Sequence, residues 1–308
     1  MTWPDTVQKG ERPDVAASSR SSSNFGSRIS RYGAQKDRAQ EQAEYIAGLP
    51  GRRYRPIVQR LDRCADYLLF RHYFTVDDLR LRAARFCQLH LLCPFCAGRR
   101  GAKALGAYLE RWEVVRAENA ALRPFLVTLT VRDGADLEER VSHLRGAHQR
   151  LWKRRADSRG FAGSVMRGVA GGVWSYEVKR GRGSGLWHPH VHGVWLAQVR
   201  PDPFALSAEW AELTGDSRIV DVRPIEGDPV EGFCEVFKYA LKFSDMTPRD
   251  TFFAYERLRG VRLLDAAGAF RGVEVPASMT DELLDGLPYV DRFFRFVHGR
   301  GYQERPAY

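Results

Sequence analysis

The sequence predicts an α+β fold in which helices flank a central, mainly antiparallel β-sheet. Residues 125–131 form an apolar, β-branched run bounded by a proline and an Asp-Gly pair, which is typical of a central strand. Two further strand-like segments, Val173–Lys179 and Pro189–Ala197, are separated by a Gly- and Arg-rich loop and therefore predict an antiparallel hairpin. Segments with helical spacing lie between these strands. Hairpin pairing mixed with helices in this way favours the α+β class.

The other elements follow from local patterns in chain order. The first half of the segment 51–100 has apolar residues at helical spacing, including Ile57, Leu61 and the run 67–69. One further short strand is expected at 218–222. Helices are expected at about 102–119, 137–156, 203–214 and 230–243.

Composition restricts the possible functions. The chain has 308 residues, of which 44% are hydrophobic, enough for one sizeable core or for a core plus a small module. Its 48 Lys and Arg exceed its 38 Asp and Glu by 10, a balance that favours a polyanionic partner through release of counterions. The sequence has no run of about 18 apolar residues, so it predicts no membrane span. The N-terminus lacks the pattern of a secretory signal. The odd number of cysteines, three of them clustered, predicts metal binding in a reducing cytoplasm.

Residues 1–48 differ from the rest of the chain. They are rich in Ser, Arg, Gln and Asp, contain a serine patch at 18–23, and have no apolar period. This composition predicts a disordered basic arm. Such an arm either contacts DNA non-specifically or is only a solvated tail.

A cluster of cysteines predicts a structural metal site. Cys93 and Cys96 form a Cys-x2-Cys knuckle, and Cys87 adds a third thiolate. Cys64 can complete a site of four thiolates, with His90 as the competing fourth ligand. This donor set matches structural Zn²⁺, whose binding contributes folding energy.

The segment 187–196 contains three of the eight histidines of the chain. On a strand, His190 and His192 point to the same face with their Cα atoms roughly 7 Å apart, so both can bind one divalent ion. Glu177 on the paired strand can lie beside them as a third ligand. This mixed N/O set suits Mn²⁺ or Mg²⁺ in a nuclease and would also accept Zn²⁺ or Ni²⁺. His188 shares their parity and is a candidate for contacting metal or DNA.

The helix expected at 230–243 carries a second group of reactive side chains. Glu235, Tyr239 and Lys242 stand at i, i+4 and i+7 and share the polar face. A phenol can attack phosphorus when a neighbouring metal ion and ammonium activate it. Lys242 can also neutralise a phosphate, and Glu235 can act as a general base for water.

These motifs together resemble the rolling-circle plasmid replication initiators of the HUH endonuclease superfamily. The matching segments, in family order, are the cysteine module with Cys-Pro-Phe-Cys, the strand 125–130, the His-Pro-His-Val-His run 188–192 and the helix 235–242. The last segment is similar to that of a branch with a glutamate four residues before its tyrosine. A weaker similarity lies at 260–270. The resemblance covers roughly residues 52–272.

The resemblance implies a mechanism. The protein would bind a double-strand origin that extrudes a single-stranded hairpin, and Tyr239 would cut one strand to leave a 5′-phosphotyrosine and a free 3′-OH. At termination Glu235 would activate water for the closing cleavage. Host helicase, polymerase and single-strand binding protein are implied partners, and no membrane is involved.

The resemblance also suggests a division of the chain. The expected parts are a basic arm at 1–48, a zinc-binding module at 49–105, an HUH-like catalytic domain at 106–260 and a C-terminal extension at 261–308.

Two other functions remain open from the sequence. An insertion-sequence transposase of the same superfamily combines similar motifs, but such enzymes often use two tyrosines, whereas position 235 is Glu. A non-catalytic DNA-binding regulator with a zinc module would require neither Tyr239 nor the two histidines.

Overall fold

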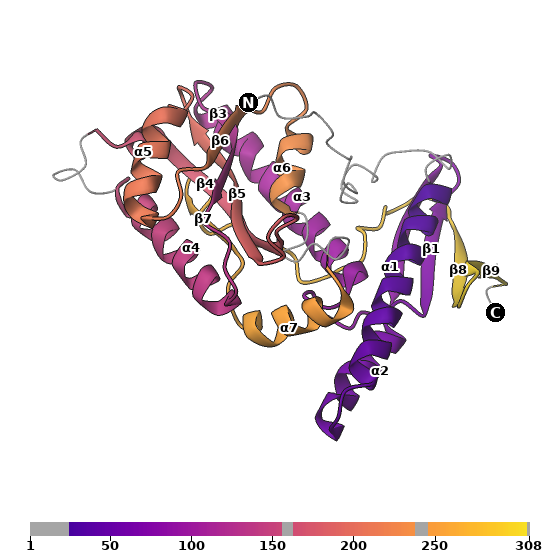
Figure 1. Ribbon diagram of the computed structural model, residues 1–308. Coiled ribbons are helices and arrows are strands. Elements are labelled where there is room, and N and C mark those ends of the chain that lie inside the picture. The colour runs from indigo at the N-terminus through magenta and orange to yellow at the C-terminus, as the bar shows by residue number, and fades with distance from the viewer. Residues whose placement is uncertain (1–24, 156–162, 238–245, 307–308) are drawn as a thin grey trace.

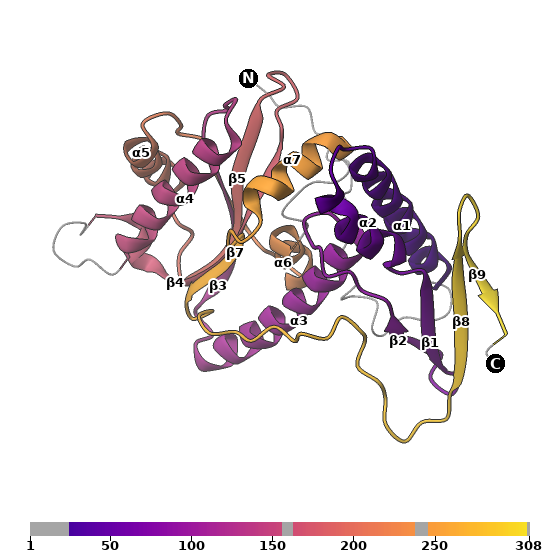
Figure 2. The same cartoon turned by 90° about the horizontal axis from the view of Figure 1, so that it is seen from below.

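The computed structural model describes residues 25–155, 163–237 and 246–306, which form two lobes, each with its own sheet (Figure 1). The histidine lobe is built on a five-stranded sheet. The cysteine lobe is built on a four-stranded sheet and the cluster of four cysteines. The two sheets lie toward opposite ends of the molecule, and the C-terminal strands belong to the cysteine lobe (Figure 2).

The sheet of the histidine lobe is antiparallel throughout. In order across the sheet, its strands are β6 (Val220–Pro224), β3 (Arg123–Thr130), β5 (Trp187–Ala197), β4 (Val169–Arg180) and β7 (Leu264–Gly268). The central pair is the expected hairpin, in which Glu177 faces His190 and Ser175 faces His192. On the other side of β5, Thr128 faces His192.

Helices cover both faces of this sheet. α4 (Leu137–Lys153), α5 (Pro203–Thr214) and α7 (Pro248–Leu258) pack on one face, which includes Trp174, Tyr176 and Trp195. α3 (Pro94–Glu118) and α6 (Pro229–Phe237) pack on the other face, over Val173 and Val194. Alternation along the strands places Glu177, His190 and His192 on the α3–α6 face, because they are an even number of residues from Val173 or Val194.

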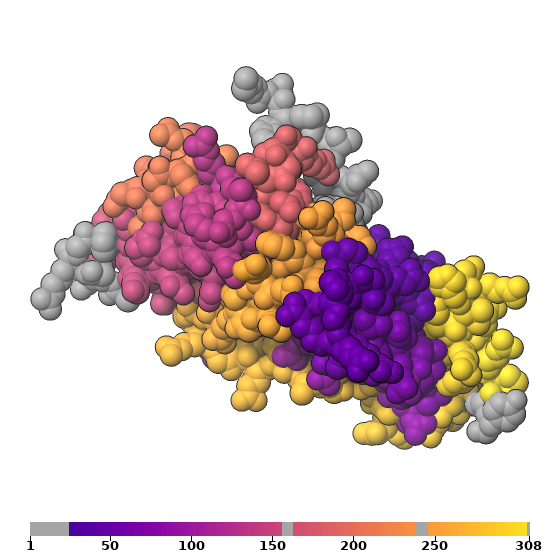
Figure 3. Space-filling view, turned by 60° about the horizontal axis from the view of Figure 1, so that its bottom comes forward, coloured from indigo at the N-terminus to yellow at the C-terminus, as the bar shows by residue number. Residues whose placement is uncertain are grey.

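The cysteine lobe combines the two ends of the described chain. Its antiparallel sheet has the order β2 (Asp78–Ala84), β1 (Tyr67–Tyr73), β8 (Val290–Val297) and β9 (Gly301–Arg305). α1 (Phe25–Ala47) packs on one face of this sheet, and the short η3 (Arg52–Tyr54) and α2 (Arg55–Arg63) follow it. In the space-filling view, the indigo surface of α1 and α2 lies against the orange surface of α7 (Figure 3).

The structure corrects the expected disordered arm for residues 25–47, which form α1. Tyr32, Ala39, Ala43 and Ile46 make one almost completely buried side of this helix. Buried polar side chains such as Lys36 share that side, so the mean hydropathy of the segment is low and its helical period is hard to detect. Residues 1–24 lie outside the described residues.

The expected helical run at 67–69 is a second correction. These residues begin β1, whose side chains alternate between buried Leu68 and Phe70 and the more exposed Tyr67, Leu69 and Arg71. A short apolar run is compatible with both a helix and a strand. Here, pairing with β2 and β8 makes it a strand.

The structure also distributes the chain differently from the expected domain ranges. α3 continues across the expected boundary at 105 and reaches from the cysteine cluster to the five-stranded sheet. The expected C-terminal extension is divided: β7 joins the histidine lobe, whereas β8 and β9 complete the sheet of the cysteine lobe. Such long-range strand pairing leaves no local signal in the sequence.

Asp281 ties the segment between β7 and β8 to the cysteine lobe. Its carboxylate accepts hydrogen bonds from Arg28 at 2.5 Å, Arg99 at 2.6 Å and the backbone N–H of Leu81 at 2.6 Å. Burial alone would raise the pKa of Asp281, but the two arginines outweigh it and hold that pKa well below its usual value. A single carboxylate therefore joins α1, α3 and β2.

The expected fold class is confirmed: the chain is α+β, with antiparallel sheets flanked by helices and a four-cysteine cluster toward its N-terminal part. Among the helices of the described segments, none has the length and apolar character needed to cross a membrane.

Candidate metal centres

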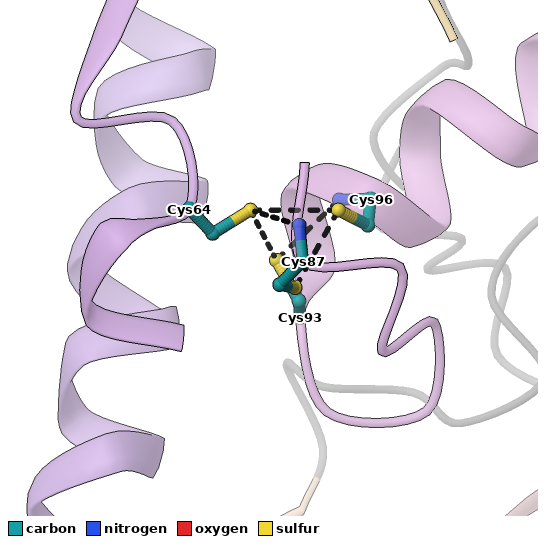
Figure 4. Close-up of side chains that lie close together, drawn as sticks. All are labelled: Cys64, Cys87, Cys93 and Cys96. Atoms are coloured by element: carbon teal, nitrogen blue, oxygen red, sulfur yellow. Dashed lines mark hydrogen bonds between the residues drawn. The ribbon is translucent and has the colours of Figure 1, made fainter. Parts of the chain in front are cut away.

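The four predicted cysteines converge on one point in the cysteine lobe (Figure 4). Cys64 follows α2, Cys87 follows β2, and Cys93 and Cys96 lie at the start of α3. The Sγ atom of Cys64 lies 3.5 Å from that of Cys93 and 3.4 Å from that of Cys96, and the Sγ atoms of Cys87 and Cys96 are 3.6 Å apart. None of the five cysteines of the chain forms a disulfide.

This geometry fits a tetrahedral metal ion. With Zn–S bonds of about 2.3 Å, four sulfur atoms at the corners of a tetrahedron lie about 3.8 Å apart. Backbone N–H groups donate to two of the thiols, that of Cys87 to Cys64 and that of Cys96 to Cys93. All four side chains are at most 4% exposed, so the site is closed to solvent. Closure and sulfur-only donors are the properties of a structural zinc site.

His90 does not join this group, which answers the question of the fourth ligand in favour of Cys64. The Nδ1 atom of His90 lies 3.4 Å from the carbonyl oxygen of Cys96 instead of pointing toward the sulfur atoms. Buried Lys36 of α1 donates to the carbonyl oxygen of Asp62, two residues before Cys64. Its ammonium offsets negative charge at the cluster, although desolvation lowers its pKa.

Glu177, His190 and His192 form the second candidate metal site. The Nε2 atoms of His190 and His192 lie 3.3 Å and 3.7 Å from the same oxygen, Oε2 of Glu177. The side chains of Glu177 and His190 are 1% and 4% exposed, whereas that of His192 is 17% exposed. The site is therefore buried on the Glu177 side and accessible at His192.

The outer nitrogen atoms of both histidines have contacts that orient the rings. Nδ1 of His190 lies 3.4 Å from the carbonyl oxygen of His188, and Nδ1 of His192 lies 3.0 Å from Oγ1 of Thr128. Holding Nδ1 in this way directs both Nε2 atoms toward Glu177. This is the arrangement in which histidine binds a metal ion through Nε2 while its other nitrogen is anchored. The three side chains thus fit a divalent cation by both geometry and donor type.

His188 has a partner that the sequence did not reveal. Its Nδ1 atom lies 2.5 Å from a carboxylate oxygen of Asp133, in the turn that follows β3. Ser184, in the hairpin loop, donates to the other oxygen of Asp133 at 2.5 Å. Burial alone would raise the pKa of Asp133, but the hydrogen bonds from Ser184 and His188 outweigh it and lower that pKa. His188 is therefore held beside the metal-site histidines rather than among the ligands.

The predicted nucleophile helix is described only in part. Phe233, Val236 and Phe237 of α6 are buried on the sheet face that carries the metal-site residues, and Glu235 is half-buried. Tyr239 and Lys242 lie outside the described residues. Their roles therefore stay predictions, as does the expected Glu235–Tyr239 spacing of one helical turn.

A cavity of about 880 Å³ opens beside the loop end of the β4–β5 hairpin. Side chains of both lobes line it, including Tyr54 from the cysteine lobe and Trp187, Arg180 and Phe253 from the histidine lobe. The guanidinium of Arg180 lies 3.6 Å above the ring of Trp187, which itself stacks on Phe253. The cavity begins at Trp187, three residues before His190 on the same strand.

Two contacts of this site, those of Thr128 and Asp133, were absent from the sequence prediction. The sequence gives a partial sign of the contact made by Thr128. This threonine is polar at a strand position where an apolar residue would normally pack, and its strand pairs with the one that carries His192. For Asp133 the sequence signal is an Asp-Gly pair, which marks the end of a strand and does not by itself reveal a histidine partner.

The chain is similar to known replication proteins. A family model described as "Replication protein" matches residues 78–290. "Protein rep" of Bacillus sp. is 29% identical over 179 residues, covering 56% of this chain and 54% of that protein. "Protein rep" of Streptococcus pneumoniae serotype 2 is 27% identical over 178 residues, covering 55% and 52%. The chain thus matches about half the length of these curated relatives. No solved structure matches it.

The two sites have donor sets that could hold metal ions, and the family match covers well over half of the chain. The chain belongs to the replication protein family. This membership confirms the resemblance to plasmid rolling-circle replication proteins.

Proposed function

We propose that this protein initiates rolling-circle replication by nicking one strand of a plasmid origin through Tyr239. The observation that carries the proposal is the convergence of Glu177, His190 and His192 on the α6-covered face of the sheet, in a chain of the replication protein family. A buried carboxylate costs free energy unless positive charge offsets it. A cation there explains it.

The chemistry begins at the scissile phosphate. A divalent cation, Mn²⁺ or Mg²⁺, held by Glu177, His190 and His192 polarises the phosphodiester and offsets the charge that develops on its oxygens. The half-open side at His192 is where a DNA strand can approach, since Glu177 and His190 are covered. Thr128 keeps the ring of His192 in place during this approach.

Tyr239 is proposed as the nucleophile because of its position in the sequence. Phe237, two residues before it, is buried on the same sheet face as the metal-site residues. The phenol oxygen forms a bond to phosphorus as the bond from phosphorus to the 3′ oxygen breaks. The phenol proton goes to solvent or a nearby base, and the departing 3′ oxygen takes up a proton. The products are a 5′-phosphotyrosine and a free 3′-OH.

Lys242 and Glu235 complete the proposed machinery. The ammonium of Lys242 would neutralise the phosphate and help activate the attacking phenol. Glu235 directs a water molecule at the second phosphate during termination, so that the closing cleavage yields a hydrolysed end. Host helicase, polymerase and single-strand binding protein would then act on the nicked DNA.

The direct test is Tyr239→Phe, which retains the ring and removes only the attacking oxygen. Purified protein is incubated with a hairpin oligonucleotide carrying the origin cut site and Mn²⁺, and the covalent adduct is separated on a denaturing gel. The adduct should fall by several orders of magnitude while DNA binding is unchanged. The matched control is Tyr255→Phe on α7, which should form the adduct normally. An adduct with Tyr239→Phe and none with Tyr255→Phe would assign the nucleophile to Tyr255.

A second experiment separates the two cleavages. Glu235→Gln should form the first adduct at nearly the normal rate and fail to release the hydrolysed product, because only the water-dependent step needs the carboxylate. The readout is the ratio of hydrolysed to rejoined oligonucleotide. Loss of the first nick as complete as in Tyr239→Phe would contradict this division of labour.

The same assays address the two rival functions. A non-catalytic regulator would bind DNA and form no adduct with any substrate, and its binding would not respond to changes at His190 or His192. A transposase would cleave and join element ends in preference to a plasmid origin, and the comparison of the two substrates measures this directly.

A further inference from the structure

The sheet of the cysteine lobe has one packed face and one open face. On the packed face Leu68, Phe70 and Phe294 are buried beneath α1, and Phe25 of that helix lies edge-on to Phe70 with ring centroids 5.1 Å apart. Residues directly opposite one another on paired strands share a face. Tyr67, which alternates with Leu68, is therefore on the open face together with its partner on β8, Arg295.

The open face carries aromatic rings set among arginines. Tyr67 and Phe293 stack with centroids 5.9 Å apart and planes at 23°. At one end the guanidinium of Arg71 lies 3.7 Å above the ring of Tyr289, which is 45% exposed. At the other end Arg295 is exposed on β8. Rings and cations thus alternate over the part of this face near Tyr67 and Phe293, whereas its Tyr73 end is covered by the segment that contains Leu284 and Tyr289.

The charge of this face is strongly positive. Its arginines are Arg71, Arg80, Arg82, Arg295 and Arg305, and its carboxylates are Asp78 and Asp291, a difference of three positive charges. Asp78 pairs with Arg80, and Asp291 pairs with Arg82 at 2.8 Å and lies 3.6 Å from Arg71. The exposed Arg295 and Arg305, on the two C-terminal strands, supply most of the remaining charge.

We infer that this open face, made jointly by β1, β2, β8 and β9, binds single-stranded DNA. Bases stack on the aromatic rings, and phosphates are neutralised by the surrounding arginines. A sheet face with partly exposed rings favours an unpaired strand, because a duplex keeps its bases stacked on one another and offers the rings only its backbone. The face is on a different sheet from Glu177, His190 and His192, and β9 lies beyond the residues that the family match covers.

The inference rests on the proposed function only in taking DNA as the substrate. A strand held on this face is at the opposite end of the molecule from α4 and α5 (Figure 2). The face therefore provides an anchor for the strand on either side of the cut, independent of the nicking chemistry. Loss of the anchor should raise the DNA concentration needed for nicking and leave the maximal rate unchanged.

The test uses the full chain with its zinc, no added divalent ion, and a fluorescein-labelled 20-mer of thymidine beside a duplex of equal length. The double variant Arg295→Glu, Arg305→Glu should weaken binding of the single strand at least tenfold. It should also lower the slope of log K against log salt by about 1.4, because each lost phosphate contact contributes about 0.7. The matched control, Arg116→Glu with Arg123→Glu, reverses two exposed arginines of the histidine lobe and α3 and should change affinity less than twofold.

A second variant tests stacking separately from charge. Phe293→Ala should weaken binding about tenfold without changing the salt slope, as expected for the loss of one base–ring contact. Zinc content and circular dichroism confirm that each variant is folded. Normal affinity of the double arginine variant would overturn the inference, as would an equal loss of duplex and single-strand binding. Absence of nicking by the parent protein would contradict the proposed function and leave these binding results interpretable.

Discussion

The two candidate metal sites are built in opposite ways. The cysteine cluster has four sulfur donors, is buried on all sides and draws its ligands from three separate segments of one lobe. The Glu177 site has three donors of mixed type on one hairpin, and one of its candidate ligands reaches solvent. A closed site holds the chain together around its ion, whereas an open site leaves positions for water and substrate. We therefore expect the first to need its metal for folding and the second to fold without metal.

The largest expected effect follows from removing the closed site. A Cys93→Ser, Cys96→Ser double variant should lose its zinc and unfold the cysteine lobe, because the binding energy of the ion is part of the folding energy. Elemental analysis of the parent protein should give about one tightly held zinc per chain. The control is Cys234→Ser, which changes a buried cysteine of α6 outside the cluster and should retain the zinc. Zinc that persists in the double variant would show that the cysteines are not the ligands.

The open site should respond differently. His192→Ala should lower the affinity for Mn²⁺ by more than about 100-fold, since loss of a mere supporting contact already costs 10–100-fold. Zinc content and thermal stability should remain close to those of the parent. Calorimetric titration with Mn²⁺ measures the first quantity and elemental analysis the second.

A graded variant sharpens this result. Thr128→Val removes only the contact to Nδ1 of His192 and should weaken Mn²⁺ binding about tenfold. An unchanged affinity in His192→Ala would exclude this metal site, whatever the result for Thr128→Val.

The smallest expected effect is a pH dependence of folding stability that comes from a histidine buried in the core of the histidine lobe. Burial lowers the pKa of His148 to about 3, and its Nε2 accepts a hydrogen bond from Trp152 while its Nδ1 contacts the hydroxyl of Tyr176. In the unfolded chain a histidine takes up a proton below about pH 6.5. Burial of neutral His148 therefore costs no stability above about pH 6.5. As the pH falls from 6.5 toward 3, the unfolded chain takes up a proton that the folded state does not, and the folded state loses stability. By pH 5 the loss is about 2 kcal/mol.

His148→Phe provides the comparison for this prediction. The variant should lose about 2 kcal/mol less than the parent between pH 7 and pH 5 in urea denaturation followed by tryptophan fluorescence. Zinc content is measured at both pH values, so that acid effects on the cysteine cluster are kept separate. An identical pH dependence of the two proteins would contradict the assignment.

The sequence determined the local features of this protein. The strand at 125–131 and the hairpin carrying His190 and His192 follow from side-chain period and turn composition, and β4–β5 pairing brings Glu177 opposite His190 as expected. The spacing of Cys87, Cys93 and Cys96 likewise indicated a metal site. These features depend on residues close together in the chain, where alternation and ligand spacing are strong constraints.

Only the tertiary structure decided the long-range features. It chose Cys64 over His90, turned residues 25–47 into a helix, and paired β8 with β1, more than two hundred residues away, and β9 with β8. It also placed Asp133 on His188. Each of these outcomes depends on burying surface from distant segments together. That free energy is a property of the assembled core, so no local pattern in the sequence records it.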